Sequence, residues 1–106
     1  MTTEPEVQHW DDRRDGPLTE TAMRNKLETL GYRVTRYVYP PGTRFAEHIH
    51  AVDKIDSVLS GQFRLTLQGR EVLLKAGDQI VVPRGAQHSA EVMGDLEVVS
   101  LDATRS

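Results

Sequence analysis

Three of the four histidines in this sequence stand where a metal site could use them. His48 and His50 are separated by one residue, so on a β-strand both side chains leave the same face, about 6.6–7 Å apart along the backbone. Two imidazoles at that spacing can converge on one ion. A His-x-His pair is equally typical of a half-exposed strand without ligands, so the pair alone leaves both interpretations open.

The third histidine, His88, follows a segment with strong turn signals. Gly77 and Asp78 predict a turn before a short apolar strand. Pro83 predicts the end of that strand, and Gly85 permits the chain to reverse before His88. The pattern fits a metal ligand at the start of the next strand, and it also fits an ordinary strand connection with a surface histidine.

Taken together, the two segments resemble the two sequence motifs of the cupin superfamily, in the compact form of small single-domain bacterial proteins described as the cupin 2 conserved barrel. The glycines, the proline and the three histidines all stand at the family spacing. The first motif is Gly42-x5-His48-x-His50 running on to Val58-Leu59-Ser60-Gly61, and the second is Gly77-x5-Pro83-x-Gly85-x2-His88.

This resemblance implies an all-β fold, a double-stranded β-helix or jelly roll, with a metal in the mouth of the barrel and a homodimeric assembly. It implies that His48, His50 and His88 take the places of the family's three imidazole ligands. Neutral imidazole nitrogens suit a divalent transition metal, namely Zn, Ni, Fe, Cu or Co, better than Mg or Ca. The residues do not distinguish among these five metals.

The first motif departs from the family at Lys54, which stands where a glutamate ligand is usual. Three interpretations follow. Asp53 or Asp56 pairs with Lys54 or supplies an oxygen ligand, and of the two Asp56 shares the strand face of Lys54 whereas Asp53 requires a bulge. Alternatively, Lys54 turns outward and leaves a three-histidine site with open positions. In the third interpretation the barrel holds no metal and Lys54 binds an anionic ligand.

The elements that must position these residues can be read from periodicity and turn signals. Apolar residues at helical spacing between Thr19, a capping residue, and Gly31 predict a short amphipathic helix over roughly 19–30. Beyond it, short β-branched and alternating runs separated by turns predict an antiparallel sandwich or barrel. The strand candidates cover roughly 32–39, 44–50, 54–60, 62–67, 71–74, 79–82, 87–92 and 96–101.

The first 17 residues differ in character from the rest. They carry five acidic and two basic residues, and only Val7 and Trp10 could anchor the segment. We expect a polar arm at 1–17, lying on the surface or on a partner subunit, followed by a single cupin domain at 18–106. His9 falls in this arm, outside both motifs, and is expected to be a surface residue.

Composition limits the classes of function. A chain of 106 residues with a net charge of −3 and interspersed signs has no basic field for nucleic acid or an anionic membrane, so neither is an expected partner. It has no cysteine, which excludes thiolate metal ligands and a cysteine nucleophile. The polar start is unlike a signal peptide, and no apolar run approaches about 18 residues. We therefore expect a cytoplasmic location.

Two functions remain open. The first is a metal-dependent enzyme of the dioxygenase or isomerase type, acting on a small molecule. The second is a non-catalytic binding module or sensor for a small anionic ligand, with or without metal. A general base in the barrel mouth would favour catalysis, and Lys54, Asp53 and Asp56 are the candidates. Tyr37 and Tyr39 are further candidates for the cavity wall.

Overall fold

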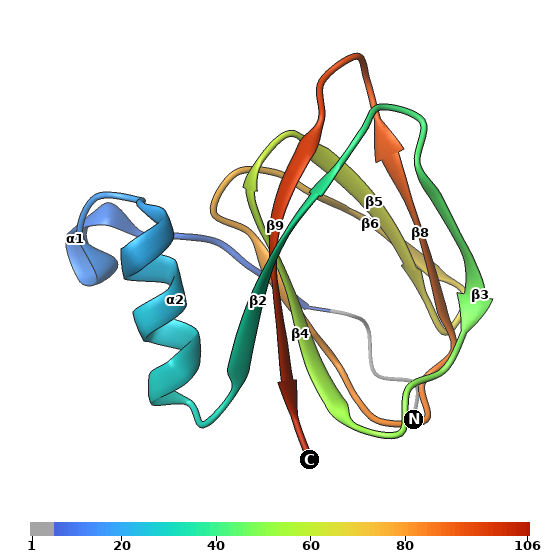
Figure 1. Cartoon of the computed structure of the whole chain (residues 1–106), viewed down its shortest axis with the longest axis horizontal. Helices are drawn as coiled ribbons and strands as arrows, with labels where there is room; N and C mark the ends of the chain where they lie inside the picture. The colour runs from blue at the N-terminus through green and yellow to red at the C-terminus, as the bar shows by residue number, and fades with distance from the viewer. Residues whose placement is uncertain (1–5) are drawn as a thin grey trace.

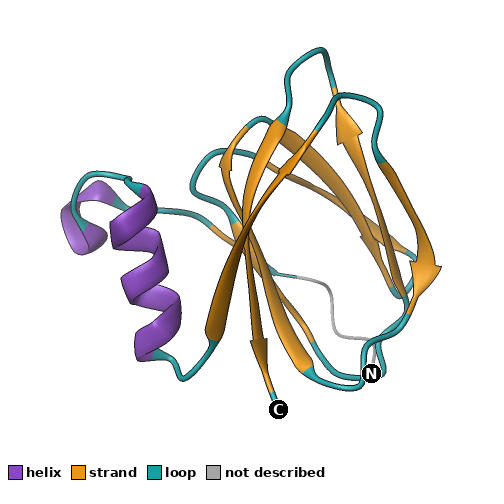
Figure 2. Ribbon diagram, viewed as in Figure 1, coloured by secondary structure: helices purple, strands orange, loops and turns teal. Residues whose placement is uncertain are grey.

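The computed structural model describes residues 6–106, in which two antiparallel sheets face one another and two helices lie to one side (Figures 1 and 2). One sheet has the strand order β1-β7-β4-β9-β2 and the other the order β3-β8-β5-β6. The helices are α1 (Asp12–Asp15) and α2 (Glu20–Thr29). The strands are β1 (Val7–Gln8), β2 (Arg33–Tyr39), β3 (Arg44–His48), β4 (Asp53–Ser60), β5 (Gln62–Leu67), β6 (Arg70–Leu74), β7 (Gln79–Val82), β8 (His88–Met93) and β9 (Val98–Arg105).

The main core lies between the two sheets, where alternate residues of each strand point inward. Phe63, Leu65 and Leu67 on β5 show this alternation, and each is at most 5% exposed. The predicted jelly-roll fold and all of the predicted strands are therefore confirmed to within a few residues at their ends. The core residues are Val58, Phe63, Leu65, Leu67, Leu74, Ile80, Val82, Ala86, Val92 and Val98.

A second apolar cluster covers the outer face of the five-stranded sheet. Helix α2 begins after Thr19, whose hydroxyl accepts a hydrogen bond from the backbone N–H of Ala22 at 3.0 Å, as its capping role predicts. Met23 and Leu27 of this helix are fully buried. Each such side chain stabilises the fold by about 1.5–3 kcal/mol. The helix thus covers the sheet face opposite to the interior of the sandwich.

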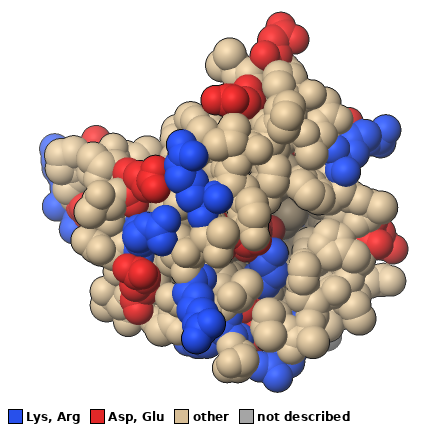
Figure 3. All heavy atoms as spheres, in the orientation of Figure 1, with Lys and Arg blue, Asp and Glu red and all other residues tan. Residues whose placement is uncertain are grey.

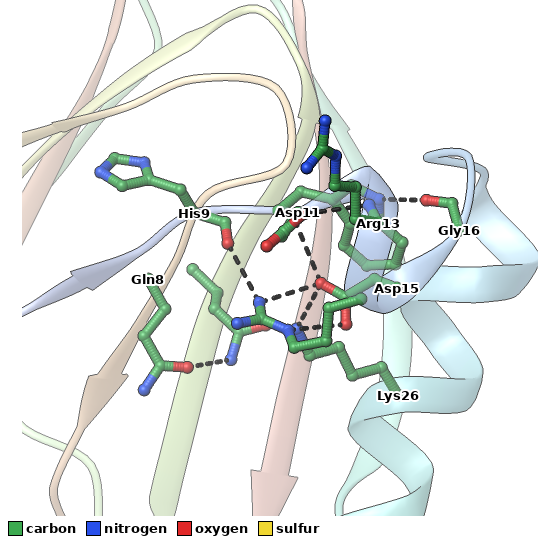
Figure 4. A network of polar contacts seen from close by, with 10 residues as sticks. Gln8, His9, Asp11, Arg13, Asp15, Gly16 and Lys26 are labelled. Atoms are coloured by element: carbon green, nitrogen blue, oxygen red, sulfur yellow. Dashed lines mark hydrogen bonds and ion pairs between the residues drawn. The ribbon is translucent and has the colours of Figure 1, made fainter.

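The N-terminal segment packs on its own domain over the described part of the predicted arm, residues 6–17. Strand β1 pairs with β7 at the edge of the five-stranded sheet. The indole N–H of Trp10 donates to the carbonyl of Gly16 at 2.8 Å, and the ammonium of Lys26 lies 5.2 Å from the Trp10 ring centroid. Figure 4 shows Lys26 and Asp15 pointing toward one another across this corner. Nζ of Lys26 donates to Oδ2 of Asp15 at 3.1 Å.

Trp10 also explains the glycine at position 77. A Cβ on Gly77 would lie 2.6 Å from the Cβ of Trp10, and the backbone φ there is +89°, which favours glycine. His9 is exposed, as expected, and its Nδ1 lies 2.6 Å from Oδ1 of Asp78. The turn that begins the second motif is therefore built against the N-terminal segment.

Positive and negative side chains are interspersed on the face drawn in Figure 3, in agreement with the sequence. No helix in residues 6–106 combines the length and apolarity needed to span a bilayer.

Candidate metal centre

The three predicted histidines meet at one end of the sandwich. His48 is the last residue of β3 and His88 the first of β8, and the two are directly opposite in the β3–β8 pairing. Their ring centroids are 4.2 Å apart, and His50 is 4.7 Å from His48 and 5.0 Å from His88. One ring nitrogen from each residue lies within 4.8 Å of the other two. The sequence therefore identified a real cluster.

The path by which His50 reaches the cluster differs from the prediction. We expected a strand over 44–50 with both histidines on one face, but β3 ends at His48 and His50 lies in the following loop. The pairing of β3 with β8 is irregular between Phe45 and His48, as at a bulge. The bend of the loop, and not the period of a strand, brings the second imidazole to the first.

Backbone carbonyls orient two of the three rings. Nδ1 of His48 lies 2.6 Å from the carbonyl oxygen of Ala46, and Nδ1 of His88 lies 3.1 Å from that of Ala86. A carbonyl only accepts, so each Nδ1 carries the proton and Nε2 keeps its lone pair. Such contacts fix the tautomer and ring angle of metal-binding histidines.

The nitrogen spacing fits a shared ion. Nε2 of His48 and Nε2 of His50 are 3.0 Å apart. Two nitrogens about 2.1 Å from one ion, at angles of about 90–109°, are about 3.0–3.4 Å apart. Burial is the main cause that lowers the pKa of both His50 and His88, and the charge of Lys54 lowers it further. Both rings are thus held neutral, the form that binds a metal.

Lys54 points into the barrel beside this cluster. Its side chain is 10% exposed, and Nζ lies 3.0 Å from each carboxylate oxygen of Asp102 on β9 and 3.8 Å from Oδ1 of Asp56. The interpretation with Lys54 turned outward is therefore wrong. Since Lys54 has two carboxylate partners, its charge is already balanced within the protein, which argues against a dedicated anion site.

The two candidate aspartates are separated as strand parity predicts. Asp56 faces inward with Lys54, with a side chain 12% exposed. Burial, the largest cause, and Asp102 together raise the pKa of Asp56 to about 6, against the opposing charge of Lys54. Asp53 begins β4 and accepts a hydrogen bond from the backbone N–H of Arg84 at 3.1 Å, so it caps the neighbouring turn and stays outside the cavity.

Asp102 is the residue that the sequence analysis missed. It is directly opposite Asp56 in the pairing of β4 with β9. Its Oδ2 accepts the hydrogen bond from Lys54, while Oδ1 is buried without a hydrogen-bond partner among the described residues. The alternation of Val98, Ser100 and Asp102 was an available signal, since it places all three on one strand face. Which residues of β4 lie opposite these three residues depends on the register of β4 against β9, and local sequence does not show that register.

A cavity of about 310 Å³ joins these groups. One side carries the histidines, Lys54 and the two aspartates, and the other carries an aromatic wall. Within that wall the Tyr39 ring contacts Phe45 edge-on at 4.9 Å and stacks on Phe63 at 5.7 Å between centroids. The lining residues are Tyr37, Tyr39, Phe45, His48, His50, Lys54, Asp56, Phe63, Leu65, His88, Ala90, Ser100 and Asp102.

The tyrosines that the sequence suggested for the cavity do line it, and Phe63 and Leu65 serve both the core and the cavity wall. Burial raises the pKa of Tyr39, and the charges of Asp102 and Asp56 raise it further, so its phenol stays protonated. The cavity therefore combines a polar end suited to a metal and proton chemistry with an apolar end suited to excluding water.

Comparison with known proteins agrees with this architecture. The sequence family described as "Cupin domain" matches residues 35–104. The cupin domain of Schizosaccharomyces pombe Cnp3 superposes with a TM-score of 0.66 at 17% identity, over 71% of this chain and 56% of that one. An RmlC-like cupin from Shewanella frigidimarina superposes with a TM-score of 0.63 at 22% identity, over 69% of this chain and 64% of that one. This chain thus spans less than two thirds of the length of either protein.

A structure described as that of the DMSP lyases RdDddP and RnDddQII is also similar, with a TM-score of 0.65 at 26% identity. The match covers 71% of this chain and 38% of that one. No curated protein matches the sequence.

Proposed function

This chain belongs to the cupin family, and on that premise we propose that it is a metal-dependent enzyme of the isomerase type, moving a proton within a small molecule bound in the barrel. The observation that carries the proposal is the shared cavity. Three imidazole nitrogens within 4.8 Å of one another open onto the same space as the buried Lys54 and Asp56 and the partly buried Asp102.

His48, His50 and His88 are the proposed ligands of one divalent transition metal, Zn, Ni, Fe, Cu or Co. When bound, such an ion polarises a carbonyl or hydroxyl oxygen of the substrate. The protein then has to orient the substrate, exclude water and hold a proton nearby. The aromatic wall and the Lys54–Asp102 pair line the same cavity, and we assign those tasks to them.

The buried acid–base groups favour an isomerase over the other two functions considered. A dioxygenase needs open coordination positions but no proton-transferring pair. A passive binding module needs neither, and a sensor for an anion would use a lysine whose charge is not already matched by two carboxylates.

Elemental analysis of protein purified without a His tag tests the metal proposal. We expect about one transition-metal ion per chain in the parent, and loss of that ion in the double variant His48→Ala, His50→Ala. The matched control is His9→Ala, because His9 is an exposed histidine in the arm, outside the cluster. Sub-stoichiometric metal that is unchanged in the double variant would refute the proposal.

We also propose that the protein is a homodimer. Strand β2 forms one edge of the five-stranded sheet, and its residues Tyr37 and Val38 are 43% and 42% exposed, which leaves apolar surface at that edge. Light scattering at micromolar concentration tests the assembly, and a mass of 11.9 kDa would contradict it. Deleting residues 1–16 should weaken the dimer if the arm takes part. A cytoplasmic location stays a prediction from the sequence.

A further inference from the structure

The buried groups beside the histidines carry an imbalance of charge. Lys54 brings one positive charge, and Asp56 and Asp102 together bring two negative charges when both are ionised. The two aspartates are directly opposite each other on neighbouring antiparallel strands, where Cβ atoms are about 4.5–5.5 Å apart. Two carboxylates that share a buried site do not both ionise freely.

The hydrogen bonds of Lys54 and the two aspartates also favour the binding of one proton. Lys54 is hydrogen-bonded to Oδ2 of Asp102. Oδ1 also lies 3.0 Å from the Lys54 ammonium, but it is buried and accepts no hydrogen bond from residues 6–106. A buried acceptor without a donor is costly. A proton on Asp56 would supply a hydrogen-bond donor for this oxygen of Asp102. The same proton would cancel the excess negative charge of the two carboxylates.

Asp56 lies among titratable groups of several strands. The titratable groups that act on it are Lys54 on its own strand, Asp102 on β9, Tyr39 on β2 and, through its charge, His48 on β3. Strand β7, on its other side, adds apolar core side chains. Burial and Asp102 raise the pKa of Asp56 by more than Lys54 lowers it. This direction agrees with the geometric argument.

We propose that Asp56 and Asp102 act as one proton-exchanging pair, in which Asp102 is the catalytic acid–base residue and Asp56 positions and recharges it. The assignment follows exposure, because the Asp102 side chain is 18% exposed and the Asp56 side chain is 12% exposed, while both line the cavity. Lys54 holds the Asp102 carboxylate in place. The inference rests on the proposed function in assuming that a substrate occupies the cavity.

The proton step balances without any further reactant. Asp102 accepts a proton from a substrate carbon that bears a hydroxyl group and lies next to a carbonyl group. The C–H bond breaks, its electron pair forms the C=C bond of an enediolate, the π pair of the carbonyl moves onto its oxygen, and an O–H bond forms on the carboxyl. The hydroxyl proton passes to the former carbonyl oxygen, the other oxygen becomes the new carbonyl, and Asp102 returns its proton to the neighbouring carbon, which completes an isomerisation. The substrate class is therefore a small hydroxyketone or hydroxyaldehyde, sized for about 310 Å³.

The first test examines the pair in metal-free protein, independently of activity. In protein labelled with 13C at the aspartate carboxyl carbon, the signals of Asp56 and Asp102 should shift together between pH 8 and pH 5 as one proton binds. Asp56→Asn should abolish this uptake, because Asp102 and Lys54 then balance each other. Lys54→Met should move it to higher pH by about one unit or more. Surface residue Asp12 provides the reference signal.

Separate midpoints for the two carboxyls, or uptake near neutral pH that persists in Asp56→Asn, would overturn the pair. Asp102→Asn is the second variant if Asp56→Asn fails to fold. It should leave Lys54 and Asp56 as a simple ion pair, with no uptake above pH 5.

The second test examines proton transfer with dihydroxyacetone as the probe, in D2O, with the metal content of every variant measured first. Exchange of the probe's C–H protons should fall about 100-fold or more in Asp102→Asn. In Asp56→Asn it should persist with its pH profile moved to lower pH. Exchange that is absent in the parent, or equal in parent and Asp102→Asn, would overturn the assignment.

The two proposals fail in different ways. Protein that binds no metal, yet shows the joint titration, refutes the proposed metal enzyme and supports the pair. Protein that holds its metal, yet exchanges equally fast without the Asp102 carboxylate, refutes the role given to the pair.

Discussion

Replacing Lys54 by methionine tests how strongly the buried charges of the cavity depend on one another. Nζ of Lys54 lies 3.0 Å from the Asp102 carboxylate, in a pair whose side chains are 10% and 18% exposed. At an effective dielectric of about 20, two charges at that distance attract by about 5.5 kcal/mol before desolvation is counted. Removing one partner of a buried pair typically costs about 3–5 kcal/mol, because the other charge stays buried and unbalanced.

We expect the lower end of that range for Lys54→Met, about 3 kcal/mol, because methionine keeps the packing and Asp56 can take up a proton. The melting temperature should fall by roughly 10–20 °C. The measurement is urea unfolding of metal-free protein at pH 7.5. The double variant Lys54→Met, Asp102→Leu should recover most of the loss, since an apolar pair of similar volume removes the unbalanced charge.

The matched control is Arg36→Met, which breaks the ion pair with Glu20. That pair has the same 3.0 Å separation but side chains 46% and 42% exposed. An exposed pair contributes at most about 1 kcal/mol. Equal losses of stability for Lys54→Met and Arg36→Met would refute the reasoning, because it attributes the larger loss at Lys54 to the burial of that pair.

Three further predictions concern separate parts of the molecule. Lys54→Glu should tighten metal binding by about tenfold or more, because it exchanges a positive charge for the carboxylate usual in the family. Competition with a chelator measures this affinity, and an affinity equal to that of the parent would place position 54 out of reach of the ion. Hydrogen bonding to Arg14 is the main cause that lowers the pKa of Asp15, so its contribution to stability is fully present above about pH 4 and declines only as the pH falls well below that. Asp15→Asn should therefore lower the melting temperature by more at pH 7 than at pH 2, and a difference that is equal or larger at pH 2 would contradict this. Gly77→Ala should lower the free energy of unfolding by about 1–3 kcal/mol, because the new Cβ would lie 2.6 Å from the Cβ of Trp10 at a backbone φ of +89°. Urea unfolding measures this, and an unchanged unfolding midpoint would show that the N-terminal segment does not pack there in solution.

Much of the architecture was readable from local pattern. The strand positions follow from a period of two between turn residues, and helix α2 from a capping threonine, helical spacing and a following glycine. The three histidines could be selected because both motifs combine them with glycine and proline at fixed offsets. Parity also placed Asp56 correctly on the inner face with Lys54.

What the sequence left open depends on contacts between distant segments. Asp102 is 48 residues from Lys54, and only the register of β4 against β9 brings them together. A one-residue slip of that register would turn every side chain of the strand to the opposite face. The loop that carries His50, and the packing of Trp10 against Gly77, likewise depend on how the chain folds back on itself. Periodicity therefore determined which side chains face inward, and tertiary pairing decided which of them meet.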